Sequence, residues 1–517
     1  MIRPIEMEGP DDQQLVISFI KGELTPQAAE DWVSSQMSHS QLFEQTKKKD
    51  ERPVEEIIPQ EFHAYLETVF AEREIGCLPK RTTYDHAIDL IPDFVLKHGP
   101  QFRTNLKEDA EMYKFIEENK AKGFIRKSHS PQAASLFFVP KKDGKTCPVQ
   151  DYRNLNKQTI KNVYPLLRID TLIDELNGFD LFIKMDIRWG YNNVQIKKGN
   201  EWKAAFTCKA GLFKPTVMFF GLTNSPTTFQ AMMDDIFAEE IAQGWLKVYM
   251  DDLLLCGHKV KRAELVAKGL QVLAKLEKHN LFIQPMKCDF FVSRVEFLGF
   301  IIDNGTVQMD PAKVNGIVDW PPPQNITELC SFIGFCNFYH QFIDHYSNKC
   351  QLLTALTKKT QQWKWTTPEH TAFETLKVAY ASKPVLMVAD YDKAFKIKAD
   401  ASLFATGAVL LQHDINGDQH LVAYYSKALT APERNYQTYD RKFLAIIRAL
   451  REWRHYVQGS SFKTIVHTDH HNLTYFQSPQ KLTRRQVRWV VELMEYDVVL
   501  KHCAEEDGSG RCPESAH

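Results

Sequence analysis

Three aspartates have the type and spacing expected of a metal-dependent catalytic site. Asp251 and Asp252 interrupt an apolar run in VYMDDLLLCG, residues 248–257, and Asp186 ends another in FIKMDIRWGY. Burying a carboxylate is costly unless it is paired or binds a metal ion. Carboxylates at neighbouring strand ends could hold two Mg²⁺ ions, which activate a 3′-hydroxyl and stabilise in-line phosphoryl transfer. The alternative is that Met250-Asp251 is simply the tip of a two-residue hairpin.

Strand and helix patterns surround these acids and predict how they are positioned. Strands are expected within 179–196 and in a hairpin over 246–257, and two more strands within 135–156 are joined by a Lys- and Gly-bearing turn. Between them, Asn224 and Ser225 precede Pro226 as a cap, and an amphipathic helix follows within 220–241. A further helix over 260–279 precedes a strand pair within 288–303.

The C-terminal half predicts a change of architecture. Residues 310–350 are helical in pattern, with Thr327 as a helix cap, and tryptophans and prolines mark a boundary near 360–392. Strands are expected again within 393–412 and 420–429, followed by a helix over 441–457 and a strand ending in Asp469.

Composition is that of an ordinary globular protein of 517 residues, 44% hydrophobic and 25% charged. The net charge of -1 conceals an acidic start, because residues 1–60 carry six Lys/Arg and twelve Asp/Glu. We expect this segment to be a weakly ordered linker. The ten cysteines form no CxxC pair, which favours reduced thiols. No signal-peptide pattern or membrane-length apolar run is present, so we expect an intracellular protein, cytoplasmic or nuclear and not secreted.

Taken together, the motifs resemble the reverse transcriptase of a gypsy-type LTR retrotransposon, in the form common in fungi, followed by its RNase H domain. The matching stretches lie in order over about residues 55–502; they include VPKKDGK, PVQDYRNLN, IKMDIRWGYNNVQI, MFFGLTNSPTTFQAMMDDIF, VYMDDLLLC, VEFLGFIID, SFIGFCNFYHQFI, ADASLFATGAVL and VHTDHHNLTYF. The resemblance implies an α+β right-hand polymerase with fingers, palm and thumb, followed by an α/β RNase H-like domain. Residues 1–57 would be an acidic linker, 58–303 the fingers and palm, 304–360 the thumb, 361–392 the connection and 393–517 the RNase H-like domain.

The resemblance also implies roles for individual residues. The catalytic metal ligands would be Asp186, Asp251 and Asp252, holding Mg²⁺ with Mn²⁺ as an alternative. The nucleotide-binding residues would be Lys142 on the triphosphate, Tyr191 as the steric gate against a 2′-hydroxyl, and Gly221 beside the templating base pair together with 224–230. Lys287 could protonate the pyrophosphate, and 297–299 would belong to the primer grip.

Three departures from the family pattern bear on activity. In the RNase H-like domain, Asp400 and Asp469 match the first and third of four expected acids, but Lys442 and Cys512 replace the other two. Asp400, Asp469 and Lys442 carry a formal charge of -1, whereas four acids would carry -4. The Lys442 ammonium would repel Mg²⁺ and neutralise the remaining acids, so little or no RNA cleavage is expected. Cys147 replaces an arginine that grips the triphosphate, which could weaken nucleotide binding by roughly 10- to 100-fold.

These observations predict RNA-directed DNA synthesis on an RNA template from a DNA primer, or on an RNA–DNA hybrid, with deoxynucleotides and without a membrane partner. The alternative is a non-enzymatic retroelement remnant that binds RNA–DNA hybrids; a generic two-metal nuclease would leave the 220–230 segment without a purpose. Protease triplets, zinc knuckles and an integrase are absent from the sequence, which indicates a fragment of a longer polyprotein. The sequence does not define the oligomeric state.

Overall fold

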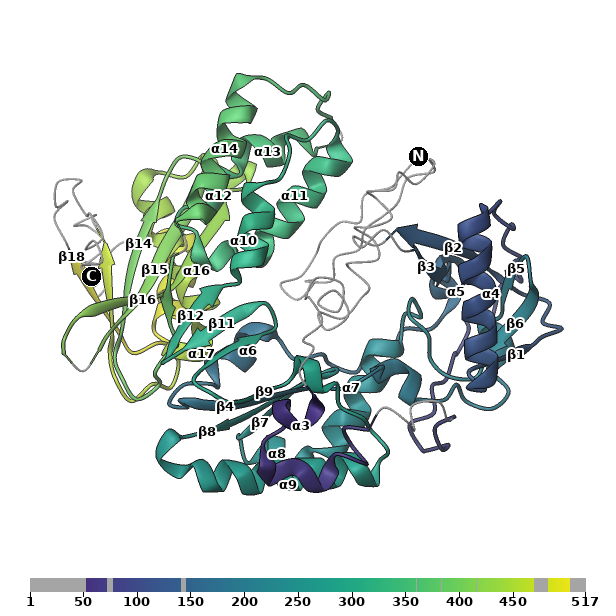
Figure 1. Cartoon of the computed structure of the whole chain (residues 1–517). Helices are drawn as coiled ribbons and strands as arrows, with labels where there is room; N and C mark the ends of the chain where they lie inside the picture. Colours follow the sequence, from purple (N-terminus) through teal and green to yellow (C-terminus); the bar gives the residue numbers. More distant parts are fainter. Residues whose placement is uncertain are drawn as a thin grey trace. The chain divides into compact units, whose positions relative to one another are not determined.

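The computed structural model describes residues 53–71, 78–140, 146–358, 360–382, 384–414, 416–468 and 482–502. The chain divides into two compact units, Met1–Leu298 and Gly299–His517 (Figure 1). The expected acidic linker lies almost wholly outside the described residues, as do Lys142, Asp469 and Cys512. Within the described ranges, no helix combines the length and the apolar character needed to span a bilayer.

An antiparallel sheet in the first unit carries the three aspartates. Its order is β7–β8–β4–β9, with bounds Leu246–Tyr249, Asp252–Gly257, Leu181–Asp186 and Asp289–Val292. Ile183, Met185, Leu253 and Leu255 are fully buried in a core shared with α7 (Ser225–Ile236) and α9 (Arg262–Lys278). The helices α7, α8 (Ala238–Ala242) and α9 lie on one side of the sheet (Figure 1). Because side chains alternate along a strand, the polar residues of β4 and β8 point to the other side.

A second sheet of the first unit has the order β1–β6–β5–β2–β3. Its strands are Ile125–Lys127, Gly211–Pro215, Phe206–Cys208, Ala134–Pro140 and Thr146–Gln150. The strands β2 and β3 form the antiparallel pair that the sequence predicts within 135–156. The helix α4 (Leu106–Ala121) begins with a capping box in which Asn105 and Glu108 satisfy each other's backbone N–H groups. Shorter elements are α3 (Val54–Ile57), α5 (Arg153–Gln158), α6 (Ile169–Asp174) and β10 (Arg294–Phe297).

The second unit begins with a short antiparallel sheet and a group of helices, as expected for 310–350. The strands are β11 (Phe300–Asp303), β12 (Thr306–Met309) and β13 (Leu386–Met387). The helices α10 to α14 span Pro311–Val318, Ile326–Phe338, Tyr346–Lys349, Gln351–Leu356 and Thr367–Ala381. The expected cap at Thr327 is wrong, because α11 begins one residue earlier. Asn325 caps it by accepting a hydrogen bond from the Glu328 N–H at 2.9 Å.

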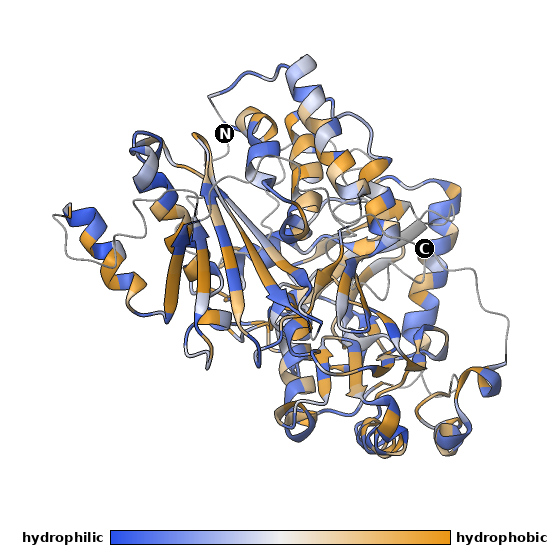
Figure 2. Cartoon of the chain, turned by 90° about the vertical axis from the view of Figure 1, so that its left-hand side faces the viewer, coloured by the Kyte–Doolittle hydropathy of each residue, from blue (hydrophilic) through white to orange (hydrophobic). Residues whose placement is uncertain are grey.

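The last sheet of this unit has the order β16–β15–β14–β17–β18. Its strands are Gln419–Ala428, Ala405–His413, Phe395–Ala401, Thr464–Thr468 and Val498–His502; β14, β17 and β18 run parallel and the others antiparallel. Apolar and polar residues alternate along the strands (Figure 2). The apolar face is buried against α16 (Thr438–Glu452) and α18 (Arg484–Leu493). The remaining helices are α15 (Ala431–Arg434) and α17 (Arg454–Val457).

The opposite face of this sheet is partly covered by the segment that enters α12. The Ser347 N–H donates to the Ser426 hydroxyl on β16 at 3.0 Å. On β15, Gly407 leaves room for His345, because a Cβ at that position would lie 3.1 Å from the His345 Nδ1. The α12 segment and the last sheet therefore pack directly against each other.

Candidate active site

The tip of the β7–β8 hairpin places the two adjacent aspartates. Tyr249 pairs with Asp252 in the strand register, so Met250 and Asp251 are the two turn residues. Met250 has φ of 52°, in the left-handed region that costs energy for a residue with a side chain. The two-residue turn weighed as an alternative does occur, and it is the element that presents the acids.

Contacts from α7 and from the residue after β4 hold this strained turn. The fully buried Gln230 on α7 accepts from the Met250 N–H at 2.7 Å and donates to the Val248 carbonyl at 3.2 Å. The Asp251 carbonyl accepts from the Ile187 N–H at 2.8 Å, just beyond β4. Backbone strain of this kind persists when the surrounding structure over-determines it.

The carboxylates of Asp186 and Asp252 lie on one face of the sheet. The two residues are opposite each other in the β4–β8 register, and their side chains point away from the α7–α9 core. They are 2% and 5% exposed, and Asp251 is 8% exposed. The structure thus brings Asp186 and Asp252 face to face and places Asp251 on the adjoining turn.

Two lysines supply counter-charge at this face. The Lys287 Nζ lies 3.7 Å from the Asp186 carboxylate, and Lys184 precedes Asp186 by two residues on the same face. Burial raises the pKa of Asp252, while Lys184 and Lys287 oppose that rise. Burial alone would lower the pKa of Lys184, but Asp252 and the neighbouring acids outweigh burial and raise it.

The donor chemistry of this face suits a divalent cation that prefers oxygen ligands. Asp186 and Asp252 are nearly excluded from water and balanced by ammonium groups, which a bound cation could replace as counter-charge. In the described part of the chain, no group of three or more His, Cys, Asp or Glu side chains forms a ready cation-binding cluster. The two acids paired across β4 and β8 are therefore the core of the candidate site, with Asp251 beside them on the turn.

Tyr191 lies against the same hairpin. Its hydroxyl donates to the Met250 Sδ at 3.6 Å, and its ring packs on Phe220 and Phe229 with centroids 5.0 and 5.9 Å away. Burial and the charge of Asp251 raise the pKa of the Tyr191 hydroxyl, so it stays neutral. Tyr191 therefore lies beside the turn that carries Asp251, and its role as a steric gate stays a prediction.

Gly221 occupies a turn whose conformation requires glycine. Its φ is 89°, and a Cβ would meet the Tyr152 ring at 3.5 Å. Asn156 on α5 holds this turn from both sides, donating to the Gly221 carbonyl at 2.6 Å and accepting from the Thr223 N–H at 3.0 Å. Sequence reasoning missed Asn156, although it lies in the quoted motif PVQDYRNLN.

The expected cap at Asn224 is correct in position but wrong in mechanism. Asn224 precedes α7, but its side chain makes no hydrogen bond to that helix. It donates instead to the Ile160 carbonyl at 2.8 Å and accepts from the Asn162 N–H at 3.0 Å. The side chain therefore fastens the segment around residues 160–162 to the start of α7.

The remaining predicted positions of the first unit are only partly described. Lys142 lies outside the described residues, and for Cys147 the structure gives the backbone, which pairs with Val139 in the β2–β3 ladder. In the expected primer grip, Phe297 is fully buried, and Leu298 and Gly299 both have positive φ. Their roles stay predictions.

In the last sheet, Lys442 faces Asp400. The Lys442 Nζ, at the start of α16, lies 3.6 Å from the Asp400 carboxylate on β14, and the two side chains are 14% and 59% exposed. The β17 strand ends at Thr468, so Asp469 falls just outside the described residues, as does Cys512 further on. An ammonium group thus meets the first of the expected RNase H acids.

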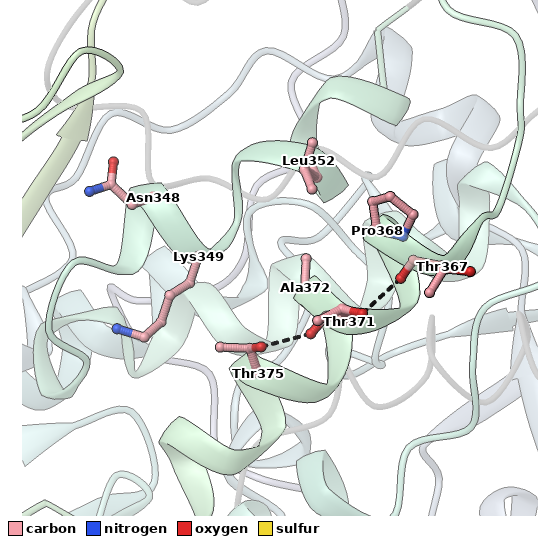
Figure 3. Close-up of a pocket in the computed structure, with 8 residues that line it drawn as sticks. All are labelled: Asn348, Lys349, Leu352, Thr367, Pro368, Thr371, Ala372 and Thr375. Atoms are coloured by element: carbon pink, nitrogen blue, oxygen red, sulfur yellow. Dashed lines mark hydrogen bonds between the residues drawn. The ribbon is translucent and has the colours of Figure 1, made fainter.

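A hollow of about 560 Å³ lies in the second unit between α12, α13 and α14 (Figure 3). Thr371 and Thr375 line it, but their hydroxyls donate to the carbonyls of Thr367 and Thr371 one turn earlier at 2.9 and 2.7 Å. Lys349, also on its wall, donates to the Asp344 carbonyl at 2.6 Å. These three polar groups are already bonded to backbone carbonyls, so we do not assign the hollow as a candidate catalytic site.

Comparison with protein families identifies two domains. Residues 139–302 match the family described as reverse transcriptase (RNA-dependent DNA polymerase). Residues 390–496 match the RNase H-like domain found in reverse transcriptase. The two matches follow each other in the order that the motifs predict.

Related proteins and solved structures agree with these matches. The chain is 34% identical over 391 residues to the transposon Tf2-3 and Tf2-4 polyproteins of Schizosaccharomyces pombe; the match covers 75% of this chain and 29% of each relative. The chain thus spans less than a third of the length of these relatives. Two structures of the foamy viral protease-reverse transcriptase, both solved with double-stranded DNA, have TM-scores of 0.73 and 0.72 at 20% identity. The first match covers 90% of this chain and 81% of the viral chain, and the second covers 92% of this chain and 97% of the viral chain.

The fold likeness confirms the predicted polymerase fold followed by an RNase H-like domain. The matched domains and the transposon relatives confirm the predicted resemblance to LTR retrotransposon polyproteins. This chain therefore carries a reverse transcriptase domain followed by an RNase H-like domain, in the order that the motifs predict, and it is similar to transposon polyproteins.

Proposed function

We propose that this chain is an RNA-directed DNA polymerase that extends a DNA primer on an RNA or DNA template with deoxynucleotides. The observation that carries the proposal is the register pairing of Asp186 with Asp252 inside a domain that matches the reverse transcriptase family. Nucleic acid as the partner is supported by the foamy viral neighbours, one of which was solved with an RNA/DNA hybrid (TM-score 0.69, 20% identity, covering 92% of this chain and 64% of that one).

Asp186, Asp251 and Asp252 would hold Mg²⁺ at the face of the sheet that points away from α7 and α9. Bound there, the ions would lower the pKa of the primer 3′-hydroxyl and neutralise the triphosphate. Lys287, 3.7 Å from Asp186, is close enough to exchange its carboxylate partner for a phosphate oxygen. Tyr191, packed under the hairpin, would reject a nucleotide with a 2′-hydroxyl by contact.

The RNase H-like domain is proposed to be catalytically silent. The Lys442 ammonium already neutralises Asp400, and adding a cation there would place like charges side by side. The domain would then contribute to folding and hybrid binding without cutting RNA.

One experiment tests both parts. An end-labelled RNA template annealed to a differently labelled DNA primer is incubated with the chain, Mg²⁺ and deoxynucleotides, with Asp251→Asn as the control. We expect primer extension that is lost in the control, with the RNA left intact. Hybrid binding without extension would favour the non-enzymatic remnant, and RNA cleavage would refute the silent RNase H-like domain.

A further inference from the structure

We propose that Tyr164 and Asp234 are positioning residues for the polymerase site. They would fix the amide of Gln230 and, through it, the strained turn that carries Asp251. This inference rests on the proposed polymerase function, because it concerns the geometry of that site. Among the described residues, their hydrogen bonds run to Gln230 and not directly to the hairpin, so the effect would pass through the Gln230 amide.

The turn depends on one side-chain acceptor from α7. Met250 has a left-handed backbone, and its N–H donates to the Gln230 Oε1 at 2.7 Å. A buried N–H without a partner is costly, and here the partner also holds the unfavourable φ in place. The orientation of the Gln230 amide therefore decides whether the turn is stabilised.

Asp234 determines that orientation. The Gln230 Nε2 donates to the Asp234 Oδ1 at 2.7 Å and to the Val248 carbonyl at 3.2 Å. An ionised carboxylate only accepts hydrogen bonds, and so does a carbonyl, so both require the NH₂ end of the amide. A flipped amide would turn its oxygen toward two acceptors and its NH₂ group toward the Met250 N–H.

Tyr164 holds Asp234 from the other side. Its hydroxyl donates to the Asp234 Oδ2 at 2.6 Å. Tyr164 lies on the segment between α5 and α6, which Asn224 also fastens to the start of α7. The resulting series of hydrogen bonds, Tyr164 to Asp234 to Gln230 to Met250, runs from a half-buried tyrosine on a mostly exposed segment across one helix to the hairpin.

The next residue of α7 provides a matched control. The Tyr84 hydroxyl donates to Asp235, which is the same chemistry one position further along the helix. Asp235 is exposed, and among the described residues it makes no hydrogen bond to Gln230 or to the hairpin. Removing either tyrosine hydroxyl deletes one tyrosine–aspartate bond on α7, but only one of these bonds leads to the turn.

The test compares Tyr164→Phe and Asp234→Ala with Tyr84→Phe in the full chain. Amide hydrogen exchange of the 246–255 peptide is measured without substrate, and kcat and the KM for deoxynucleotide are measured by primer extension. We expect the first two variants to exchange about 3- to 10-fold faster at the hairpin and to lose about as much in kcat, with KM nearly unchanged. Tyr84→Phe should match the unmodified chain in each measurement.

A conservative variant separates positioning from general damage to the fold. Asp234→Asn retains an oxygen that can accept from Gln230, so hairpin exchange and kcat should return close to their original values. The proposal is overturned if Tyr164→Phe and Tyr84→Phe give the same hairpin exchange. It is also overturned if Tyr164→Phe changes KM and leaves kcat intact. If the unmodified chain does not extend primers, the polymerase proposal fails, and hydrogen exchange alone decides whether the relay exists.

Discussion

Replacing Lys442 tests whether its ammonium group occupies the place of a metal ion. The Lys442–Asp400 pair has an N–O distance of 3.6 Å, and the carboxylate is more than half exposed. Exposed ion pairs of this kind contribute about 0–1 kcal/mol to stability. Lys442→Met should therefore lower the free energy of unfolding of the second unit by less than about 1 kcal/mol.

Lys442→Glu should cost more, because attraction becomes repulsion. Two like charges about 4 Å apart repel by about 1 kcal/mol in water and by about 4 kcal/mol at an effective dielectric constant of 20. The exposure of Asp400 favours the lower value. Added to the lost ion pair, the total loss should be about 1–2 kcal/mol when no divalent cation is present.

Mg²⁺ should reverse this loss in the glutamate variant and not in the unmodified chain. A cation that binds the folded state stabilises it by mass action, and two facing carboxylates are oxygen ligands that suit Mg²⁺. Urea unfolding of both full chains with and without Mg²⁺ measures the effect. The polymerase acids are present in both proteins, so their contribution cancels in the difference. An equal response to Mg²⁺ in the two chains would refute the reasoning.

Three further outcomes are expected. Burial lowers the pKa of His86 to about 4, so the folded state resists protonation of this side chain. The free energy of unfolding should therefore fall as the pH falls from about 6.5 to 4, by about 2 kcal/mol at pH 5. In His86→Gln, the free energy measured by urea unfolding should depend less on pH over that range. Lys275→Met should lower the free energy of unfolding measured in urea by about 3 kcal/mol, because the fully buried Glu240 then loses the ammonium group 2.7 Å away. A decrease below about 1 kcal/mol would contradict this. Tyr191→Val should raise the ratio of ribonucleotide to deoxynucleotide incorporation in primer extension. An unchanged ratio would show that Tyr191 is not the steric gate.

The placement of the three acids could be predicted from the sequence because local patterns determine it. Asp186 ends one apolar run, and Asp251 and Asp252 lie between two others, which predicts a strand before Asp186 and a hairpin at Asp251. The side-chain contacts that hold the turn could not be predicted in the same way. Gln230 reads as one polar residue in an amphipathic helix, and its partner Met250 is twenty residues away. Side-chain bonds of this range leave no periodic signal.

The caps show the same limit at shorter range. Asn224 and Thr327 both have side chains that suit a helix start. Asn224 instead bonds to a segment more than sixty residues earlier, and Asn325 takes the place expected of Thr327. The charge of Lys442 at the RNase H-like site could be predicted, because lysine there departs from the family pattern. The structure shows its ion pair with Asp400 at that site.

The packing of the α12 segment on the last sheet bears on how such chains can recombine. The RNase H-like match begins at residue 390, yet Gly407 and Ser426 within it are covered by His345 and Ser347 from outside it. A module exchanged at residue 390 would leave that face of the sheet without its cover and the α12 segment without its support. The last sheet and the helices that precede it belong to one compact unit, which begins at Gly299.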